Sequence, residues 1–118
     1  KTLNYKIVAG LPEYVSMFLA PPLSKENSYV KPNPWKSTDG NLEFVFNAPP
    51  TGNLNLKIFD LAGIKVSEQN INLPTASFVW DRKNDAGKTV GSGVYIYILE
   101  YKSANEHYKL IDKLAIVR

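Results

Sequence analysis

Hydrophobic and polar residues alternate with a period of two along much of this chain. The alternation runs through residues 3–7, 42–46 and 54–58. Because successive side chains of a β-strand point to opposite faces, this pattern predicts strands with one buried face. Residues 94–99 are apolar on both faces, as in a central strand, and residues 110–117 are expected to form a last strand.

Turn-forming residues separate these stretches at short intervals. Gly, Pro, Asn and Asp cluster at residues 10–12, 21–22, 32–34, 39–41, 49–52, 60–63, 84–87 and 91–93. Many short strands between such turns are typical of an all-β sandwich or barrel, and no segment has the period of an amphipathic helix. A hairpin is predicted at Asp60 to Gly63, because Gly63 can adopt a positive φ.

A domain boundary is expected near residues 21–31, where prolines flank a polar stretch. Before it lie two candidate strands, at residues 3–9 and 14–20. Two strands alone bury too little surface to fold, so they are expected to pair with the remaining chain, to pack on a partner or to end a preceding domain. We therefore assign residues 1–28 to an N-terminal extension or the end of a preceding domain, and residues 29–118 to a β-sandwich cut from a longer polypeptide.

Five segments of the second region resemble one known family. Residues 31–35 resemble its opening YPNPF motif, residues 56–66 its pattern L-x-I-Y-D-x-x-G-x-x-V, and residues 80–90 its pattern W-D-G-x-D-x-x-G-x-x-V. Residues 92–97 resemble S-G-V-Y-x-Y, and residues 113–118 resemble the closing strand. In this order and spacing they resemble the FlgD-like immunoglobulin-like domain, a family close in pattern to the C-terminal sorting domains of type IX secretion.

The resemblance implies an immunoglobulin-like or fibronectin-III-like antiparallel β-sandwich of about seven strands, with an N-terminal strand extension. It implies a non-catalytic C-terminal module of a larger extracellular or surface-attached bacterial protein, serving as spacer, surface anchor or secretion-sorting element. Its partners would be the preceding domains of the same polypeptide and the secretion or cell-surface machinery. The residues that carry the structural motifs are Pro32, Asn33, Pro34, Asp60, Gly63, Trp80, Asp81, Gly87, Gly93 and Tyr95.

Trp80 and Asp81 can also be interpreted from the residues themselves. Trp80 ends an alternating run, so its ring is expected in the core, and Asp81 can then accept hydrogen bonds from turn amides. The alternative is an ion site, because Asp81 and Asp85 are four residues apart. The calcium-loop pattern fails at three further positions, so the structural turn is favoured. The family has Gly where this chain has Arg82, which predicts a different turn geometry there.

Trp35 is the one candidate for ligand stacking. An exposed ring at this position would make the domain a carbohydrate-binding module, with a polysaccharide as partner. The competing interpretation is a ring that fills the open end of the sandwich, which we favour because aromatic rings supply large buried areas in small cores. Tyr95, Tyr97 and Tyr101 share one face of one strand, where packing or a tyrosine-corner hydrogen bond explains them.

Composition removes most catalytic and cofactor chemistry. The chain has no cysteine and one histidine, His107, so thiolate sites and histidine clusters are excluded. His107 is expected at a hairpin tip, with its neighbour Glu106 on the opposite face. No acid pair, phosphate loop or G-x-S-x-G motif is present, and we expect neither an enzyme nor a cofactor.

Charge and hydrophobicity exclude two classes of partner. The net charge is +3, charged residues make up 21% of the chain, and they are scattered singly, so nothing indicates a nucleic-acid partner. No apolar stretch approaches the length of a membrane span.

Overall fold

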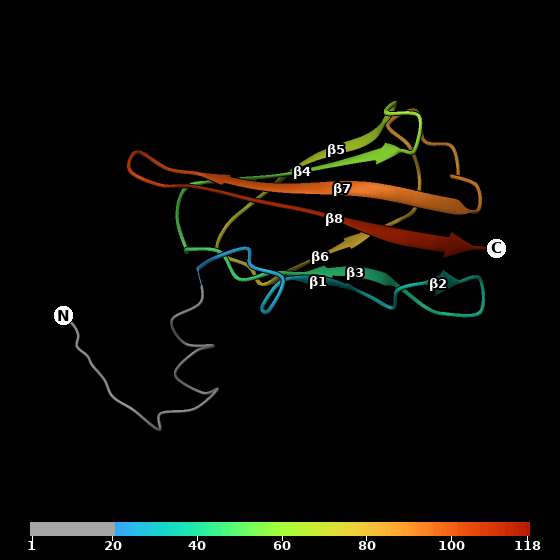
Figure 1. The fold of residues 1–118 in the computed structure, drawn as a ribbon, viewed down its shortest axis with the longest axis horizontal. Coiled ribbons are helices and arrows are strands. Elements are labelled where there is room, and N and C mark those ends of the chain that lie inside the picture. The colour runs from blue at the N-terminus through green and yellow to red at the C-terminus, as the bar shows by residue number, and fades with distance from the viewer. Residues whose placement is uncertain (1–20) are drawn as a thin grey trace, which may run out of the picture.

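The computed structural model describes residues 21–118, which form eight strands and no helix (Figure 1). The all-β class predicted from the period-two alternation is confirmed, with eight strands instead of about seven. The strands expected at residues 3–9 and 14–20 lie outside the described residues. The eight strands are β1 (Tyr29–Lys31), β2 (Trp35–Lys36), β3 (Leu42–Val45), β4 (Asn53–Asp60), β5 (Lys65–Ile71), β6 (Ser77–Trp80), β7 (Gly93–Lys102) and β8 (His107–Val117).

The strands form two sheets that face each other as layers (Figure 1). The smaller sheet has the order β1-β3-β6, and the larger sheet has the order β2-β8-β7-β4-β5. All strand pairs are antiparallel except β2 with β8, which is parallel. This arrangement is that of an immunoglobulin-like sandwich.

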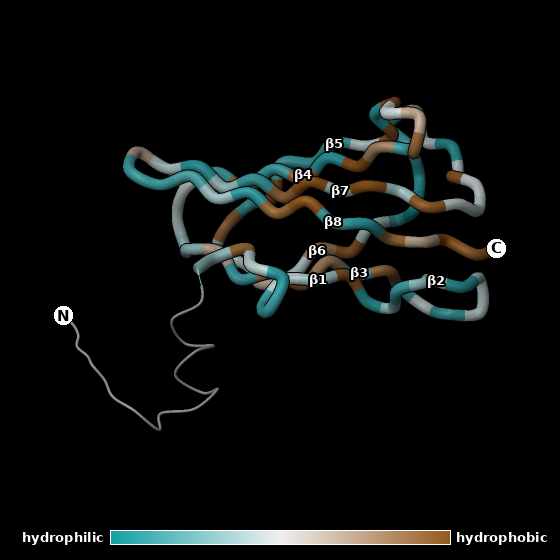
Figure 2. The backbone as a smooth tube through the Cα atoms, in the orientation of Figure 1, coloured by the Kyte–Doolittle hydropathy of each residue, from teal (hydrophilic) through white to brown (hydrophobic). Residues whose placement is uncertain are grey.

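The core is built from the inward-facing residues of both sheets. Along β4, hydrophobic and hydrophilic residues alternate in Figure 2 as the pleat requires. On β7 the tyrosines are buried, and Ile96 and Ile98 on the opposite face are half-buried. Phe44 of the smaller sheet meets Tyr97 of the larger sheet edge to face, with ring centroids 5.1 Å apart. Burying one such large apolar side chain contributes about 1.5–3 kcal/mol. The expected inward face of Tyr95, Tyr97 and Tyr101 is confirmed, since all three are buried.

The long β7–β8 hairpin projects beyond the body of the sandwich at one end (Figure 1). Ten residue pairs connect its two strands, from Gly93 with Ile116 to Lys102 with His107. The turn comprises residues 103–106, where the Ser103 amide donates to the Glu106 carbonyl. His107 is therefore the first residue of β8 and not part of the hairpin tip, because its backbone still belongs to the ladder.

Candidate functional site

The turn after β6 is organised around Trp80 and Asp81. The Trp80 ring is 1% exposed and its Nε1 donates to the Lys83 carbonyl at 3.1 Å. Asp81 Oδ1 accepts the Lys83 amide at 3.0 Å, as expected for an aspartate at a strand end. Asp85 does not bond within this turn, because its Oδ1 accepts the Glu68 amide of β5. The two carboxylates thus hold different backbone segments.

Arg82 adopts the positive φ for which the related pattern has a glycine. Its φ is +61°, and its guanidinium lies 4.3 Å from the centroid of the Trp35 ring. Arg82 Nη1 also donates to the Trp80 carbonyl at 3.2 Å. Arg82 thus takes the left-handed conformation that suits a glycine, and it is held there by contacts that a glycine cannot make. The different turn geometry expected from the Gly-to-Arg change stays a prediction.

Trp35 is an interior residue, which removes the basis of the carbohydrate-stacking hypothesis. Its side chain is 3% exposed, and its Nε1 donates to the Gly40 carbonyl at 2.9 Å. Besides Arg82, the guanidinium of Arg118 lies 5.3 Å from the ring centroid, and Arg118 Nε donates to the Val90 carbonyl. The ring therefore fills the end of the core beneath two arginines and has no free face for a sugar.

The Pro32–Asn33–Pro34 segment carries the chain from the smaller to the larger sheet. Asn33 acts as a substitute for one strand residue: its Nδ2 donates to the Lys113 carbonyl at 3.1 Å, and its Oδ1 accepts the Ala115 amide at 3.0 Å. β2 continues this contact by pairing with the last residues of β8. The motif thus covers part of the outer edge of β8.

Two further motif elements are structural turns. Asp60 Oδ1 accepts the amides of Ala62 and Ile64, and Gly63 has φ +86°, so the predicted hairpin between β4 and β5 is confirmed.

Tyr95 donates its hydroxyl to the Gly91 carbonyl at 2.7 Å, four residues upstream, as in a tyrosine corner. Burial raises the pKa of Tyr95, as expected for a phenol held inside the fold. Gly93 begins β7 and Gly87, at φ +85°, lies in the turn before it.

Gly52 and Tyr101 form a contact that no local sequence signal indicated. Tyr101 is 1% exposed, and its hydroxyl donates to the Thr51 carbonyl. Gly52 has φ +112°, and a Cβ at this position would lie 2.5 Å from the Tyr101 hydroxyl oxygen. The close approach of a backbone to a ring requires glycine here.

His107 pairs with an acid across the hairpin and not with its sequence neighbour. Its Nε2 lies 2.6 Å from Glu100 Oε2, and Lys102 Nζ lies 3.9 Å from the same oxygen. The hydrogen bond from His107 lowers the pKa of the Glu100 carboxyl. Glu106 instead accepts a hydrogen bond from the Tyr108 hydroxyl. His107 and Glu100 thus form a hydrogen-bonded side-chain pair that joins the two strands of the hairpin.

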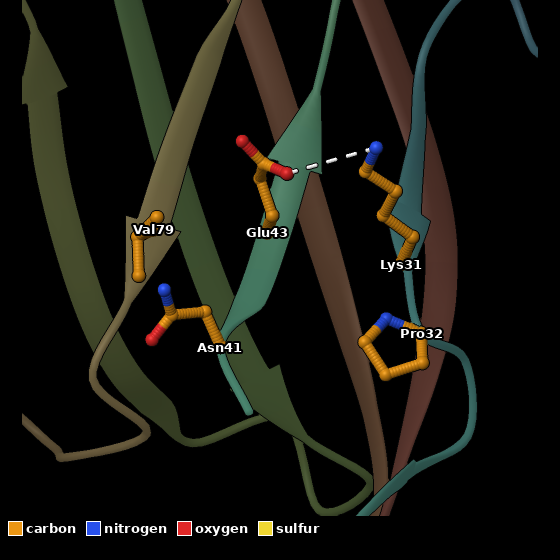
Figure 3. A pocket seen from close by; sticks show the side chains of 5 residues that line it. All are labelled: Lys31, Pro32, Asn41, Glu43 and Val79. Carbon is orange, nitrogen blue, oxygen red and sulfur yellow. Dashed lines mark ion pairs between the residues drawn. The ribbon is translucent and has the colours of Figure 1, made fainter. Parts of the chain in front are cut away.

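Two shallow depressions lie on the surface of the described residues, 21–118. One, of about 370 Å³, lies on the outer face of the smaller sheet, where Lys31 and Glu43 form an ion pair 3.8 Å long beside Val79 (Figure 3). The other, of about 560 Å³, lies between residues 49–53 and the β7–β8 turn. The second depression is lined by Thr51, Ser103 and Glu106 among others. Ser103 Oγ accepts the backbone amides of Asn105 and Glu106, so this hydroxyl holds the β7–β8 turn.

Between residues 21 and 118, no group of three His, Cys, Asp or Glu side chains is arranged to hold a metal ion. The same residues contain no helix that is long and apolar enough to cross a membrane.

Similarity to known proteins comes from structure. A scan against protein-family models and a search of curated proteins both find no match. Among solved structures, PorZ, an essential bacterial surface component of the type IX secretion system of Porphyromonas gingivalis, matches 79% of this chain with a TM-score of 0.57 and 22% identity. PorU from the same organism matches 84% of the chain with a TM-score of 0.63 and 21% identity. FlgD from P. aeruginosa matches 55% of this chain and 52% of its own, with a TM-score of 0.47 and 25% identity.

The matched segments are small parts of large proteins. This chain spans 12% of the length of PorZ and 10% of the length of PorU. At these identities the matches establish the fold. The chain therefore has an immunoglobulin-like β-sandwich fold that also forms one segment of PorZ and one segment of PorU.

Proposed function

We propose that this domain is a non-catalytic structural and interaction module of a larger extracellular bacterial protein. In this role it anchors its polypeptide at the cell surface or directs it there during secretion. The observation that carries the proposal is that the same fold forms about a tenth of PorZ and of PorU, and that PorZ is a surface component of a secretion system.

The interior of the sandwich supports a role without catalysis. The aromatic rings that a binding cleft would expose are packed inside, as the exposures of Trp35 and Trp80 indicate. The single histidine is engaged by Glu100, and the chain has no cysteine. A domain of this construction acts through its surface and its stability, because catalysis needs a pocket in which reactive groups converge.

Domain replacement in the parent polypeptide tests the proposal. In one variant residues 29–118 are deleted, and in a second they are replaced by an unrelated β-sandwich of similar size. Surface labelling with a membrane-impermeant reagent measures delivery in each case. We expect both variants to lose surface labelling while the remaining domains stay folded.

The replacement also separates delivery from a passive spacer role. If the unrelated sandwich restores surface labelling, the domain is a spacer and carries no delivery information. If the deletion variant is delivered normally, the domain neither anchors its polypeptide at the surface nor directs it there, and the proposal is wrong. Turnover of a substrate by the isolated domain would contradict its non-catalytic part.

A further inference from the structure

The edges of the two sheets differ in how far they are covered. The edge at β5 is occupied by the turn after β6, because the Asp85 amide donates to the Val66 carbonyl and the Glu68 amide donates to Asp85 Oδ1. In the smaller sheet, the edge strands β1 and β6 have three and four residues. β8 has eleven residues, and its outer side pairs with β2 only at Ile116 and Val117.

The outward backbone groups of β8 can be identified from the contacts at its covered end. The Lys113 carbonyl and the Ala115 amide point outward, because both bond to Asn33. Along an antiparallel strand, every second residue directs its amide and carbonyl to the same side, and the β7–β8 register is uninterrupted. The amides and carbonyls of Lys109 and Ile111 therefore also point outward. Among residues 21–118, β8 pairs only with β7 on its inner side and with β2 at residues 116–117, so these four groups have no backbone partner there.

We infer that this open stretch of β8, residues 107–112, is a docking edge for an extended segment of a partner protein, which adds to the larger sheet as a further strand. Such strand addition derives its affinity from main-chain hydrogen bonds and its specificity from alternate side chains. Asn33 limits the register, because its amide already occupies the edge beyond Asp112. The inference deepens the proposed function and rests on it for the existence of an external partner.

The side chains along the edge determine the chemistry of the partner. The outer face of the sheet along β8 carries every second side chain, namely Lys109, Ile111 and Lys113. Ile111 is 52% exposed. Glu100, which is opposite Lys109 on β7, is already engaged by His107 and Lys102. Opposite charges on directly opposed strand residues are favourable, so the partner segment presents an acidic residue opposite Lys109 and an apolar residue opposite Ile111.

A second copy of this chain is a poorer occupant. The outward-facing side chains of β8 between residues 107 and 113 are His107, Lys109, Ile111 and Lys113, which include no carboxylate. Two β8 edges joined in an antiparallel pair therefore leave Lys109 without an opposite charge in every register. Lysines at an open edge oppose self-association of this kind.

Amide hydrogen exchange and peptide titration of the full 118-residue chain test the inference. The probes are two short peptides with one Glu and one Val two positions apart, in either order, among threonines. In the free chain, we expect the Lys109 and Ile111 amides to exchange faster than those of Leu110 and Asp112, which point toward β7. One peptide should slow their exchange and shift the resonances of residues 107–112.

Charge variants separate specific docking from general electrostatic attraction. We expect Lys109→Glu to weaken binding of the acidic peptide about three- to tenfold and to favour a peptide with Lys in place of Glu. Lys88→Glu makes the same charge change in the turn after β6 and should leave binding unchanged. A peptide N-methylated at the amides that would donate to β8 should not bind.

Several results would overturn the inference. Slow exchange of the Lys109 and Ile111 amides in the free chain would mean that another part of the chain or a second copy already occupies the edge. Equal loss of binding in Lys88→Glu and Lys109→Glu, or normal binding of the N-methylated peptide, would also refute it. Because these measurements involve no export, they can fail while surface delivery succeeds, and the reverse also holds.

Discussion

Gly52 offers the sharpest test of how the β7–β8 hairpin is joined to the body of the sandwich. Gly52 has φ +112°, and a Cβ added there would lie 2.5 Å from the Tyr101 hydroxyl oxygen and 2.7 Å from two ring carbons. The ring cannot easily withdraw, because it is buried and its hydroxyl is bonded to the Thr51 carbonyl. Gly52→Ala therefore combines backbone strain with a steric clash.

Three glycines separate these two contributions. Gly40 meets neither constraint, Gly87 has φ +85° with open space around it, and Gly52 has both a positive φ and the clash. A positive φ costs a non-glycine residue about 1–2 kcal/mol, and overpacking adds about 1–3 kcal/mol. Displacing the Tyr101 hydroxyl loses about 1 kcal/mol more. We expect destabilisation of about 0–0.5 kcal/mol for Gly40→Ala, about 1–2 for Gly87→Ala and about 3–6 for Gly52→Ala.

Urea denaturation of the 118-residue chain measures these free energies of unfolding. Fluorescence of Trp35 and Trp80 reports the transition, since both rings are buried. A small domain has a total stability of about 5–15 kcal/mol, so Gly52→Ala should lose a large fraction of it with little change in m-value. Equal stability of the Gly52→Ala and Gly87→Ala variants would refute the close contact between Gly52 and Tyr101.

Substitutions at three further residues probe the core and its charges. Arg82→Ala should lower the free energy of unfolding by about 2–3 kcal/mol, because it loses the contact with the Trp35 ring and the hydrogen bond to the Trp80 carbonyl. Arg82→Gly should be about 1 kcal/mol more stable than Arg82→Ala, because glycine adopts the positive φ without strain. Urea denaturation measures both differences. Ser67 is 1% exposed and its hydroxyl has no partner among the described residues, so Ser67→Ala should leave the melting temperature unchanged or raise it. Burial raises the pKa of the Tyr97 hydroxyl from 10.0 to about 12. Because the unfolded chain loses this proton at lower pH than the folded chain, the free energy of unfolding should fall between about pH 10 and 12. Urea denaturation across this range should show a smaller fall for Tyr97→Phe.

Local patterns predicted the parts of the fold that depend on neighbouring residues. The alternation in residues 54–58 and the Asp60–Gly63 turn predicted the β4–β5 hairpin, because both signals lie within a few positions. The alternation that ends at Trp80 likewise predicts a ring in the core, and the ring is buried. Alternation and turn residues are informative because residues a few positions apart in the sequence are also close together in space.

Contacts between distant segments were beyond these patterns. Asn33 bonds to backbone groups 80 and 82 residues later in the chain, and nothing around Pro32 and Pro34 indicates which strand it meets. The short strands β1 and β2 could not be predicted for a different reason, because two or three residues carry no measurable period. The partner of His107 was also missed, because Glu100 comes close only when the hairpin forms.

Transfer of the domain to a reporter tests the central claim most directly. A reporter that its natural host exports across the inner membrane would carry residues 1–118 at its C-terminus, and surface labelling would be compared with the same reporter carrying an unrelated β-sandwich. The account predicts labelling of the reporter at the cell surface or in the medium only with residues 1–118. Retention of both fusions in the periplasm, with the transferred domain folded, would contradict it.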